Sequence, residues 1–410
     1  MKIKLTLFLI LFISTSTLAQ WVSRAPFPGI ARAKAVSFSV GDTLYVMGGV
    51  TNTNSVLKDF WKYDVNGNSW TQMPDFPGEE RYGATSFILG NTGYVATGGN
   101  DNGYLDDLWQ YIPSTAQWVQ RNGMPAGSAQ HENQRVEAYA FVINNKAYLG
   151  GGNGFVFGAN STNNIAFTDL WEYDPSHNSW SPLSSVPDVG KDLSVAAVLN
   201  DKAYIGLGCN VDQTINYKTF WEYDPTTDNW AQKANFPSEH TVDAGAFVYN
   251  SEMYVVGGVQ LTTLALSNEV YKYNPITNVW TLTTSYGGGA VAGQFTATSG
   301  SHIISGGGYN ASIIARNDVW EFTASSTGIN STILDESSFQ LYPNPASEYI
   351  SINHKGDISG IEIIDPTGRI VYRNDHSSEP INIADLPRGI YRMRFQTKNG
   401  FSKTEPFIKQ

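Results

Sequence analysis

A tandem repeat with a period of about fifty residues is the feature that most limits what this chain can fold into. Residues 169–180 are DLWEYDPSHNSW, and residues 219–230 are TFWEYDPTTDNW. The first aromatic residue of this segment recurs at Trp61, Trp109, Trp171, Trp221, Tyr271 and Trp320. Copies that cannot bury both of their faces alone must pack against one another, so the sequence predicts an array of similar units.

Each repeat has the pattern of four β-strands. A glycine pair after an apolar stretch, as in YVMGG (45–49) and YVVGG (254–258), precedes the aromatic segment. Before the pair, stretches such as SFSVGDTLYV alternate around a turn, which is typical of a β-hairpin. The WEYDP segment adds a third strand with an Asp-Pro turn, and the later Trp begins a fourth. Each repeat is therefore predicted to form a four-stranded antiparallel sheet.

These marks recur together and in order, and in this the sequence resembles the kelch repeat. The resemblance implies an all-β fold, a six-bladed kelch β-propeller over residues 20–323. Trp21 precedes the first glycine pair, whereas the last repeat ends without a closing Trp. The strand around 20–24 is therefore predicted to pair with the strand around 317–322, so that the N-terminal strand closes the propeller.

The N-terminus has the composition of a secretory signal peptide over residues 1–19. Lys2 and Lys4 precede an apolar run at 5–13, and the small residues at 17–19 form a cleavage site. The run is too short to span a bilayer, and no other long apolar segment follows. The mature chain is therefore expected to be exported and to have no membrane span.

The repeat ends at Thr323, and residues 324–338 have the polar composition of a linker. Residues 339–410 alternate like a small β-sandwich. This module resembles the C-terminal sorting domain of the type IX (Por) secretion system through Tyr342-Pro343-Asn344-Pro345, Asp365, Gly368, Leu386 and Gly389-Ile390-Tyr391. The resemblance implies that the type IX machinery is a partner, and that the chain passes through the periplasm to the outer surface or the medium. An adhesion sandwich is the alternative.

Charge and cysteine content exclude several kinds of site. The formal net charge is −11, which argues against a nucleic-acid partner because few cations are present to neutralise phosphates. Cys209 is the only cysteine, so an intrachain disulfide and a cysteine-rich metal site are excluded. No cofactor and no metal are expected.

Four basic residues occupy an equivalent position just before the first strand of successive repeats: Arg32, Arg81, Arg135 and Lys191. In the other two repeats the aligned residues are Thr241 and Gly289. If this position faces the channel mouth, as the kelch resemblance implies, the cations form a ligand-binding site for carboxylate or sulfate groups. The alternative is a structural role, in which each cation pairs with a neighbouring blade.

Three further residues are weak catalytic candidates, because His131 and Glu132 precede Arg135 and His240 precedes Thr241. If both loops face the mouth, these groups could support general acid–base chemistry. The alternative is that they are solvated loop residues.

Two other patterns have a structural and a functional interpretation. Aspartates recur at the start of the third strand, at Asp59, Asp107, Asp169 and Asp318, and this regularity favours a structural role over a metal cluster. The insertion at 151–171 contains Phe155, Phe157 and Phe167. Those rings either stack on sugars or a partner, or pack onto the blade edge.

The leading interpretation is an exported propeller that acts as a binding module for a glycan or a protein. The alternative is an exported sugar-acid enzyme, since some exported six-bladed kelch proteins with this layout are sialic acid mutarotases or epimerases. A scaffold without a small ligand is a third interpretation. Fold alone does not decide between them, so whether the chain is an enzyme stays open here.

Overall fold

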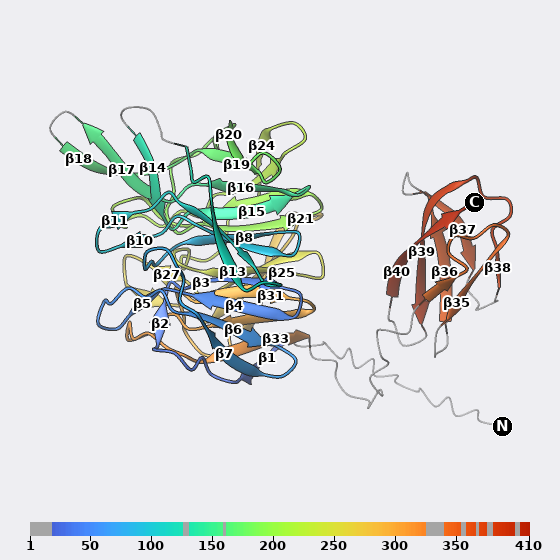
Figure 1. Ribbon diagram of the computed structural model, residues 1–410, viewed down its shortest axis with the longest axis horizontal. Helices are drawn as coiled ribbons and strands as arrows, with labels where there is room; N and C mark the ends of the chain where they lie inside the picture. The colour runs from blue at the N-terminus through green and yellow to red at the C-terminus, as the bar shows by residue number, and fades with distance from the viewer. Residues whose placement is uncertain are drawn as a thin grey trace, which may run out of the picture. The chain divides into compact units, whose positions relative to one another are not determined.

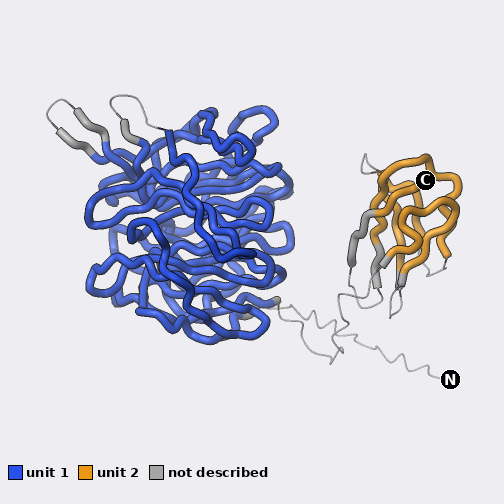
Figure 2. Tube along the Cα trace, in the orientation of Figure 1, with its two compact units in different colours: residues 1–326 blue, residues 327–410 orange. Residues whose placement is uncertain are grey.

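A computed structural model describes residues 19–125, 131–158, 161–324, 340–353, 358–365, 369–374, 380–397 and 402–410. The chain divides into two compact units, residues 1–326 and 327–410 (Figure 2). The predicted signal peptide, apart from its last residue, lies outside the described residues, and so does the predicted linker apart from its first residue. Among the described residues, no helix has the length and apolarity needed to cross a membrane.

Unit 1 contains six four-stranded antiparallel sheets, which we call blades 1 to 6 (Figure 1). Blade 1 is β3 (Val36–Val40), β4 (Thr43–Met47), β6 (Phe60–Asp64) and β7 (Ser69–Met73). Blade 2 is β8 (Thr85–Leu89), β9 (Thr92–Ala96), β12 (Leu108–Ile112) and β13 (Gln117–Arg121). Blade 3 is β15 (Tyr139–Ile143), β16 (Lys146–Gly150), β19 (Leu170–Asp174) and β20 (Ser179–Leu183).

The second half of unit 1 repeats this order. Blade 4 is β21 (Val195–Leu199), β22 (Lys202–Gly206), β23 (Phe220–Asp224) and β24 (Asn229–Gln232). Blade 5 is β25 (Gly245–Tyr249), β26 (Glu252–Val256), β29 (Glu269–Asn274) and β30 (Val279–Ser285). Blade 6 is β31 (Phe295–Ser299), β32 (His302–Gly306), β33 (Val319–Ala324) and β1 (Ala19–Arg24).

Burial along each blade explains its sequence pattern. The first strands alternate, as in β8, because one face of the strand is packed more tightly than the other. The second strands, such as β4, are almost wholly buried because neighbouring blades cover both of their faces. The last strands, such as β7, are polar and largely exposed at the outer edge.

The N-terminal strand joins the last blade, as the sequence predicts. β1 pairs antiparallel with β33, and Trp21 lies opposite Phe322. Trp21 is buried, and its ring makes edge contacts with Tyr286, Phe247 and Phe322. The first strands of the blades contact their neighbours around the unit, and β3 of blade 1 contacts both β8 and β31.

Short sheets, two of them simple hairpins, extend from one end of the blades, where the first strand begins and the second ends (Figure 1). They are β2 (Arg32–Ala33) with β5 (Val50–Thr51), β10 (Gly99–Asn100) with β11 (Gly103–Tyr104), and β27 (Val259–Gln260) with β28 (Ala265–Leu266). The largest is the sheet of β14 (His131–Val136), β17 (Asn153–Gly158) and β18 (Ser161–Ala166). The insertion at 151–171 forms most of this sheet.

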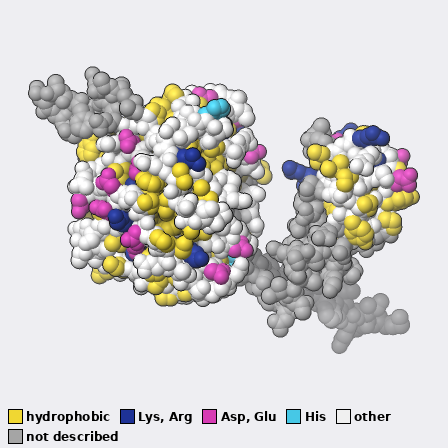
Figure 3. Space-filling model, viewed as in Figure 1, with side chains coloured by type: hydrophobic (Ala, Val, Ile, Leu, Met, Phe, Trp, Pro, Cys, Tyr) yellow, Lys and Arg dark blue, Asp and Glu magenta, His cyan; other side chains and the backbone are white. Residues whose placement is uncertain are grey.

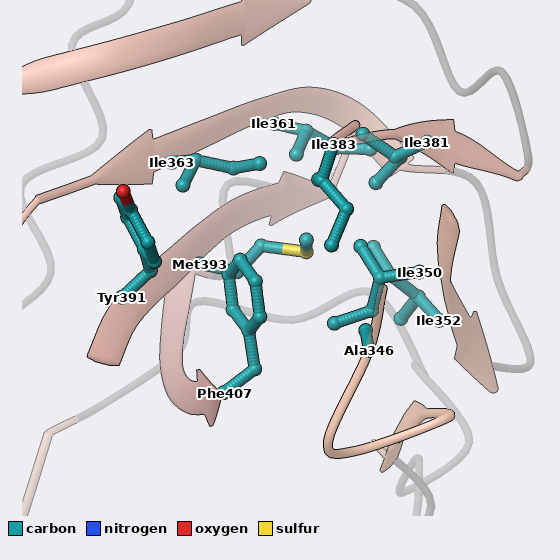
Figure 4. Packing of buried hydrophobic residues seen from close by; sticks show 10 residues of the cluster. All are labelled: Ala346, Ile350, Ile352, Ile361, Ile363, Ile381, Ile383, Tyr391, Met393 and Phe407. Carbon is teal, nitrogen blue, oxygen red and sulfur yellow. The ribbon is translucent and has the colours of Figure 1, made fainter. Parts of the chain in front are cut away.

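Unit 2 is the predicted small β-sandwich. One sheet is β34 (Gln340–Tyr342), β35 (Tyr349–Asn353) and β38 (Ile381–Asn382). The other is β37 (Ile370–Asn374), β36 (Ile358–Ile364), β39 (Gly389–Thr397) and β40 (Ser402–Lys409). Side chains from both sheets, among them Ile350, Ile363 and Met393, meet in one buried cluster (Figure 4). The unit therefore has a hydrophobic core of its own.

Candidate ligand site at the channel mouth

The three arginines that the sequence placed at the channel mouth are buried. Arg32, Arg81 and Arg135 are at most 1% exposed. Each guanidinium makes a two-point contact with the aspartate that begins the third strand of its own blade, in the pairs Arg32–Asp59, Arg81–Asp107 and Arg135–Asp169. The structural interpretation of the recurring aspartates is therefore confirmed in blades 1 to 3.

Arg81 shows how completely such a guanidinium is satisfied. Its two terminal nitrogens donate to Asp107 at 2.6 and 2.8 Å, and one also donates to the carbonyl of Thr97 at 2.9 Å. The indole of Trp109 donates to the same carboxylate at 2.7 Å, and the guanidinium lies 4.8 Å from the ring centroid of Phe76. This contact set joins the segment before the first strand to the end of the second strand, the start of the third strand and the loop between blades.

Blade 4 preserves this arrangement with different residues. Thr219 stands where the other blades have the aspartate, and the carboxylate comes instead from Asp188 in the preceding loop. Lys191 contacts Asp188 at 2.8 Å, and Trp221 donates to it at 2.8 Å. Burial alone would raise the pKa of Asp188, but hydrogen bonds from Lys191, Thr219 and Trp221 outweigh burial and lower that pKa to about 2.

These placements correct the predicted electropositive mouth. Lys191 is 5% exposed, and the arginines are more deeply buried, so none of the four charges faces open solvent. They pair within their own blades, not with a neighbouring blade. The sixth equivalent residue is Val291, not Gly289, because a glycine that follows the second strand of each blade donates to the carbonyl of this position in the next blade, and Gly258 donates to Val291. On the face shown in Figure 3, the Lys and Arg side chains of unit 1 are few and scattered.

The residues that do face the mouth lie two positions further along each repeat. They are Lys34, Gly83, Glu137, Leu193, Asp243 and Gly293. All six have a left-handed backbone, with φ between 54° and 64°, which turns the chain into its first strand. Backbone hydrogen bonds link them from blade to blade, for example from Gly83 N to Lys34 O at 3.0 Å and from Glu137 N to Gly83 O at 2.7 Å.

Three of these mouth residues are charged and form one cluster. The ammonium of Lys34 donates to the carboxylate of Glu137 and lies 3.9 Å from that of Asp243. The side chains are 18%, 6% and 18% exposed, respectively, so the cluster is accessible but poorly hydrated. With Gln294 and Ser194 these residues line a cavity of about 150 Å³. Beneath it, the first strands line the channel with small and hydroxyl side chains such as Ser37 and Thr85.

Burial and charge shift the pKa values of two residues in this cluster. Burial tends to lower the pKa of Lys34, but the charges of Glu137 and Asp243 outweigh burial and hold that pKa well above its ordinary value. Burial raises the pKa of Asp243 to about 6, although Lys34 opposes the shift. Asp243 is therefore the member of this pair whose protonation changes near neutral pH, whereas Lys34 stays charged.

A third carboxylate, Asp192, lies beneath the mouth. It is fully buried, and its Oδ1 accepts the N–H of Leu193 at 3.1 Å. At Leu193 this side-chain acceptor takes the place of the backbone carbonyl that accepts from Gly83 and Glu137. Burial first, and then the charge of Glu137, raise the pKa of Asp192 to about 8. Asp192 is therefore largely protonated at neutral pH and leaves the mouth with a small negative charge.

The predicted catalytic residues are not brought together by the described structure. His131 and Glu132 lie on β14, but their side chains are outside the described residues. His240 is half-buried, and its Nδ1 lies 3.1 Å from the hydroxyl of Ser238 and 3.9 Å from the carboxylate of Glu269. His240 thus belongs to the polar contacts of blade 5. The catalytic role of these three residues stays a prediction.

Aromatic residues surround the mouth on the hairpins. Tyr82 and Tyr309 are half-buried. Burial raises the pKa of both phenols, and the charge of Glu137 adds to this rise, whereas that of Lys34 opposes it. Of the aromatic residues in the insertion, Phe167 is buried under the guanidinium of Arg135, at 4.1 Å from its ring centroid, which is a packing role. Phe155 is half-buried near the groove between the hairpins, and the side chain of Phe157 is outside the described residues.

Family comparisons agree with both halves of this architecture. A family model for the KLHDC2/KLHL20/DRC7 kelch-repeats domain matches residues 6–188, and one for N-acetylneuraminate epimerase matches residues 184–317. A model for the secretion system C-terminal sorting domain matches residues 340–410. The chain is an exported protein of the kelch-repeat family. The sorting domain indicates type IX export of this kelch protein to the cell surface or the medium.

A solved structure shows the same fold as the kelch unit. The structure of YjhT is similar with a TM-score of 0.59 and 19% sequence identity, over 76% of this chain and 98% of that chain. At this identity the likeness shows the fold alone. No curated protein sequence matches the kelch protein significantly.

Proposed function

We propose that this kelch protein binds carbohydrate at the mouth of its channel, around Lys34, Glu137 and Asp243. The observation that carries the proposal is one ammonium held between two carboxylates in an accessible cavity. An ammonium donates to sugar hydroxyls, carboxylates accept from them, and nearby tyrosine rings contact the C–H faces of a sugar. A small number of polar groups that converge in a concave cavity is typical of a small-ligand site.

The charge of the mouth indicates which sugars are preferred. Lys34 is the one cation in the described cluster, and Glu137 and Asp243 oppose it. A carboxylated sugar would meet net repulsion, whereas a neutral sugar would meet both donors and acceptors. We therefore expect neutral sugars to bind more tightly than acidic ones, contrary to the expectation from an electropositive mouth.

Calorimetry on the purified chain with neutral and acidic sugars tests the proposal. Lys34→Met and Glu137→Gln should each weaken binding at least tenfold, which corresponds to about 1.4 kcal/mol. The matched control is Lys272→Met, which removes an outer ion pair with Glu252 at 2.8 Å and should leave binding unchanged. Binding that is equal in both mouth variants and the control would contradict the proposal.

An epimerase or mutarotase is the second candidate, and a specific observation favours it. The N-acetylneuraminate epimerase model matches residues 184–317, which include Asp243, and burial raises the pKa of this residue to about 6 beside the cation of Lys34. The Asp243 carboxylate can take a proton from a sugar hydroxyl and return it, while Lys34 stays charged and binds the sugar. In NMR exchange measurements on N-acetylneuraminate, Asp243→Asn should remove acceleration of anomeric exchange. Exchange at the uncatalysed rate with the unmodified chain would leave only the binding function.

A further inference from the structure

A second concave surface lies beside the mouth, between the hairpins of blades 2 and 3. It is a groove of about 370 Å³, larger than the mouth cavity. It is lined by Glu79, Asn100, Asn102, Tyr104, Gln134 and Phe155. These residues come from the loop before β8, the β10–β11 hairpin, and the strands β14 and β17, which lie at the same end of unit 1 (Figure 1).

Tyr82 lies between residues of the mouth and residues of the groove. Gly83 of the mouth lies against Glu137, since a Cβ built on this glycine would stand 2.8 Å from the Cγ of that side chain. The preceding residue, Tyr82, packs on Gly99, and Tyr104 packs on the same glycine. A Cβ at Gly99 would lie 3.1 Å from the Tyr104 ring and 3.3 Å from the Tyr82 ring. The two tyrosines therefore stand side by side between the mouth and the groove.

One part of the groove is an aromatic platform. The rings of Tyr104 and Phe155 are stacked, with centroids 4.6 Å apart and an interplanar angle of 16°. Both rings are half-buried, and they come from different hairpins, so each fixes the orientation of the other. A rigid aromatic surface next to polar groups is a suitable contact for the C–H face of a sugar.

Another part of the groove presents fixed polar groups. The amide of Asn100 is 8% exposed, donates to Glu79 Oε2 at 2.8 Å and accepts the backbone N–H of Asn102 at 2.8 Å. The side chain of Asn102 itself is exposed. Amide and carboxylate groups that are held in place can bind sugar hydroxyls without first losing conformational freedom.

We infer that this groove is a second sugar subsite and that the ligand is an oligosaccharide. One sugar unit occupies the mouth at Lys34, and the next ones cross Tyr82 and Tyr104 toward Asn102. The mouth cavity alone is smaller than the ~300–1,000 Å³ of typical small-ligand sites, whereas mouth and groove together reach that range. The inference rests on the proposed function, because it extends the same site.

The test compares monosaccharides with tetrasaccharides by calorimetry on the purified full chain. The probes are glucose with cellotetraose, N-acetylglucosamine with chitotetraose, and N-acetylneuraminate with its α2,8-linked tetramer. For the sugar that binds, the tetramer should bind at least tenfold more tightly than the monomer. Tyr104→Ala should remove this gain and leave the affinity for the monomer within twofold, whereas Tyr104→Phe should retain the gain.

Asn102→Ala is the second variant, because its exposed side chain can be removed without disturbing the fold. It should reduce the gain about threefold, and Lys272→Met should not change it. A monomer and a tetramer that bind equally through Lys34 would overturn the oligosaccharide inference and leave the proposed function intact. Tetramer binding that is lost in Tyr104→Ala but unaffected in Lys34→Met would retain the groove and overturn the mouth site. An absence of binding to every probe would overturn both.

Discussion

Replacement of Arg81 by methionine should destabilise unit 1 strongly. Methionine keeps most of the length and the apolar contact with Phe76, so the substitution isolates the loss of the guanidinium. Three donor contacts to Asp107 and Thr97 disappear with it. The carboxylate of Asp107 is then left with the indole of Trp109 as its remaining side-chain donor among the contacts described above.

The expected cost follows from the burial of the pair. Removal of one partner from a buried ion pair costs about 3–5 kcal/mol, because the other charge is left poorly solvated. The side chain of Asp107 is 21% exposed, so water compensates for part of the loss, and we expect about 2–4 kcal/mol. Lys146 gives the contrast, since its side chain is 33% exposed and an ion pair of this kind contributes about 0.2–1 kcal/mol.

Urea unfolding followed by tryptophan fluorescence measures this difference. All 11 tryptophans lie between residues 21 and 320, so the signal reports unit 1 alone. The midpoint should fall much further for Arg81→Met than for Lys146→Met, and an Arg81→Met/Asp107→Asn double variant should recover part of the loss. Equal midpoints for the two single variants would refute the structural role. Full stability of Arg81→Met together with lost sugar binding would support the ligand role that the sequence suggested.

Three further predictions concern closure, export and pH. Trp21→Ala should cost about 3–5 kcal/mol in the same fluorescence assay, because it removes a buried ring from the joint between β1 and β33, and a loss below about 1 kcal/mol would argue against that joint. Deletion of 339–410 should retain the chain in the periplasm with unit 1 folded, as seen by fractionation and fluorescence, and unchanged secretion would contradict it. Burial raises the pKa of Asp192 from 3.8 to about 8, so the folded state binds this proton more tightly than the unfolded state. The contribution of Asp192 to the free energy of unfolding is therefore complete below about pH 4 and is lost as the pH rises through 8. Asp192→Asn should flatten the dependence of the unfolding midpoint on pH between about pH 4 and 8. An unchanged pH dependence in this variant would exclude Asp192 as its cause.

The sequence predicted the architecture well because architecture depends on what the repeats share. Every blade must make the contacts that the glycine pairs and the aromatic third strand provide. Trp21, which stands before the first glycine pair in the sequence, provides the contact that joins β1 to blade 6. The same logic led to the error at the mouth. Alignment on the glycine pair selects the residue whose carbonyl accepts the glycine N–H, and in blade 2 this residue is Arg81. The chain turns into the channel only two residues later, at Gly83.

Substitutions among the blades separate structural charges from charges available to a ligand. Where blade 4 lacks the third-strand aspartate, Asp188 supplies the carboxylate, and in blade 6 Arg316 supplies the cation to Asp318 at 2.9 Å. Such replacements preserve one contact by different residues, which is expected of a structural requirement. The mouth position behaves oppositely, because it changes without compensation from Lys34 to Gly83 to Glu137. The mouth position thus keeps its place in every repeat while its residue type varies. Such a position is where this propeller is free to acquire a ligand.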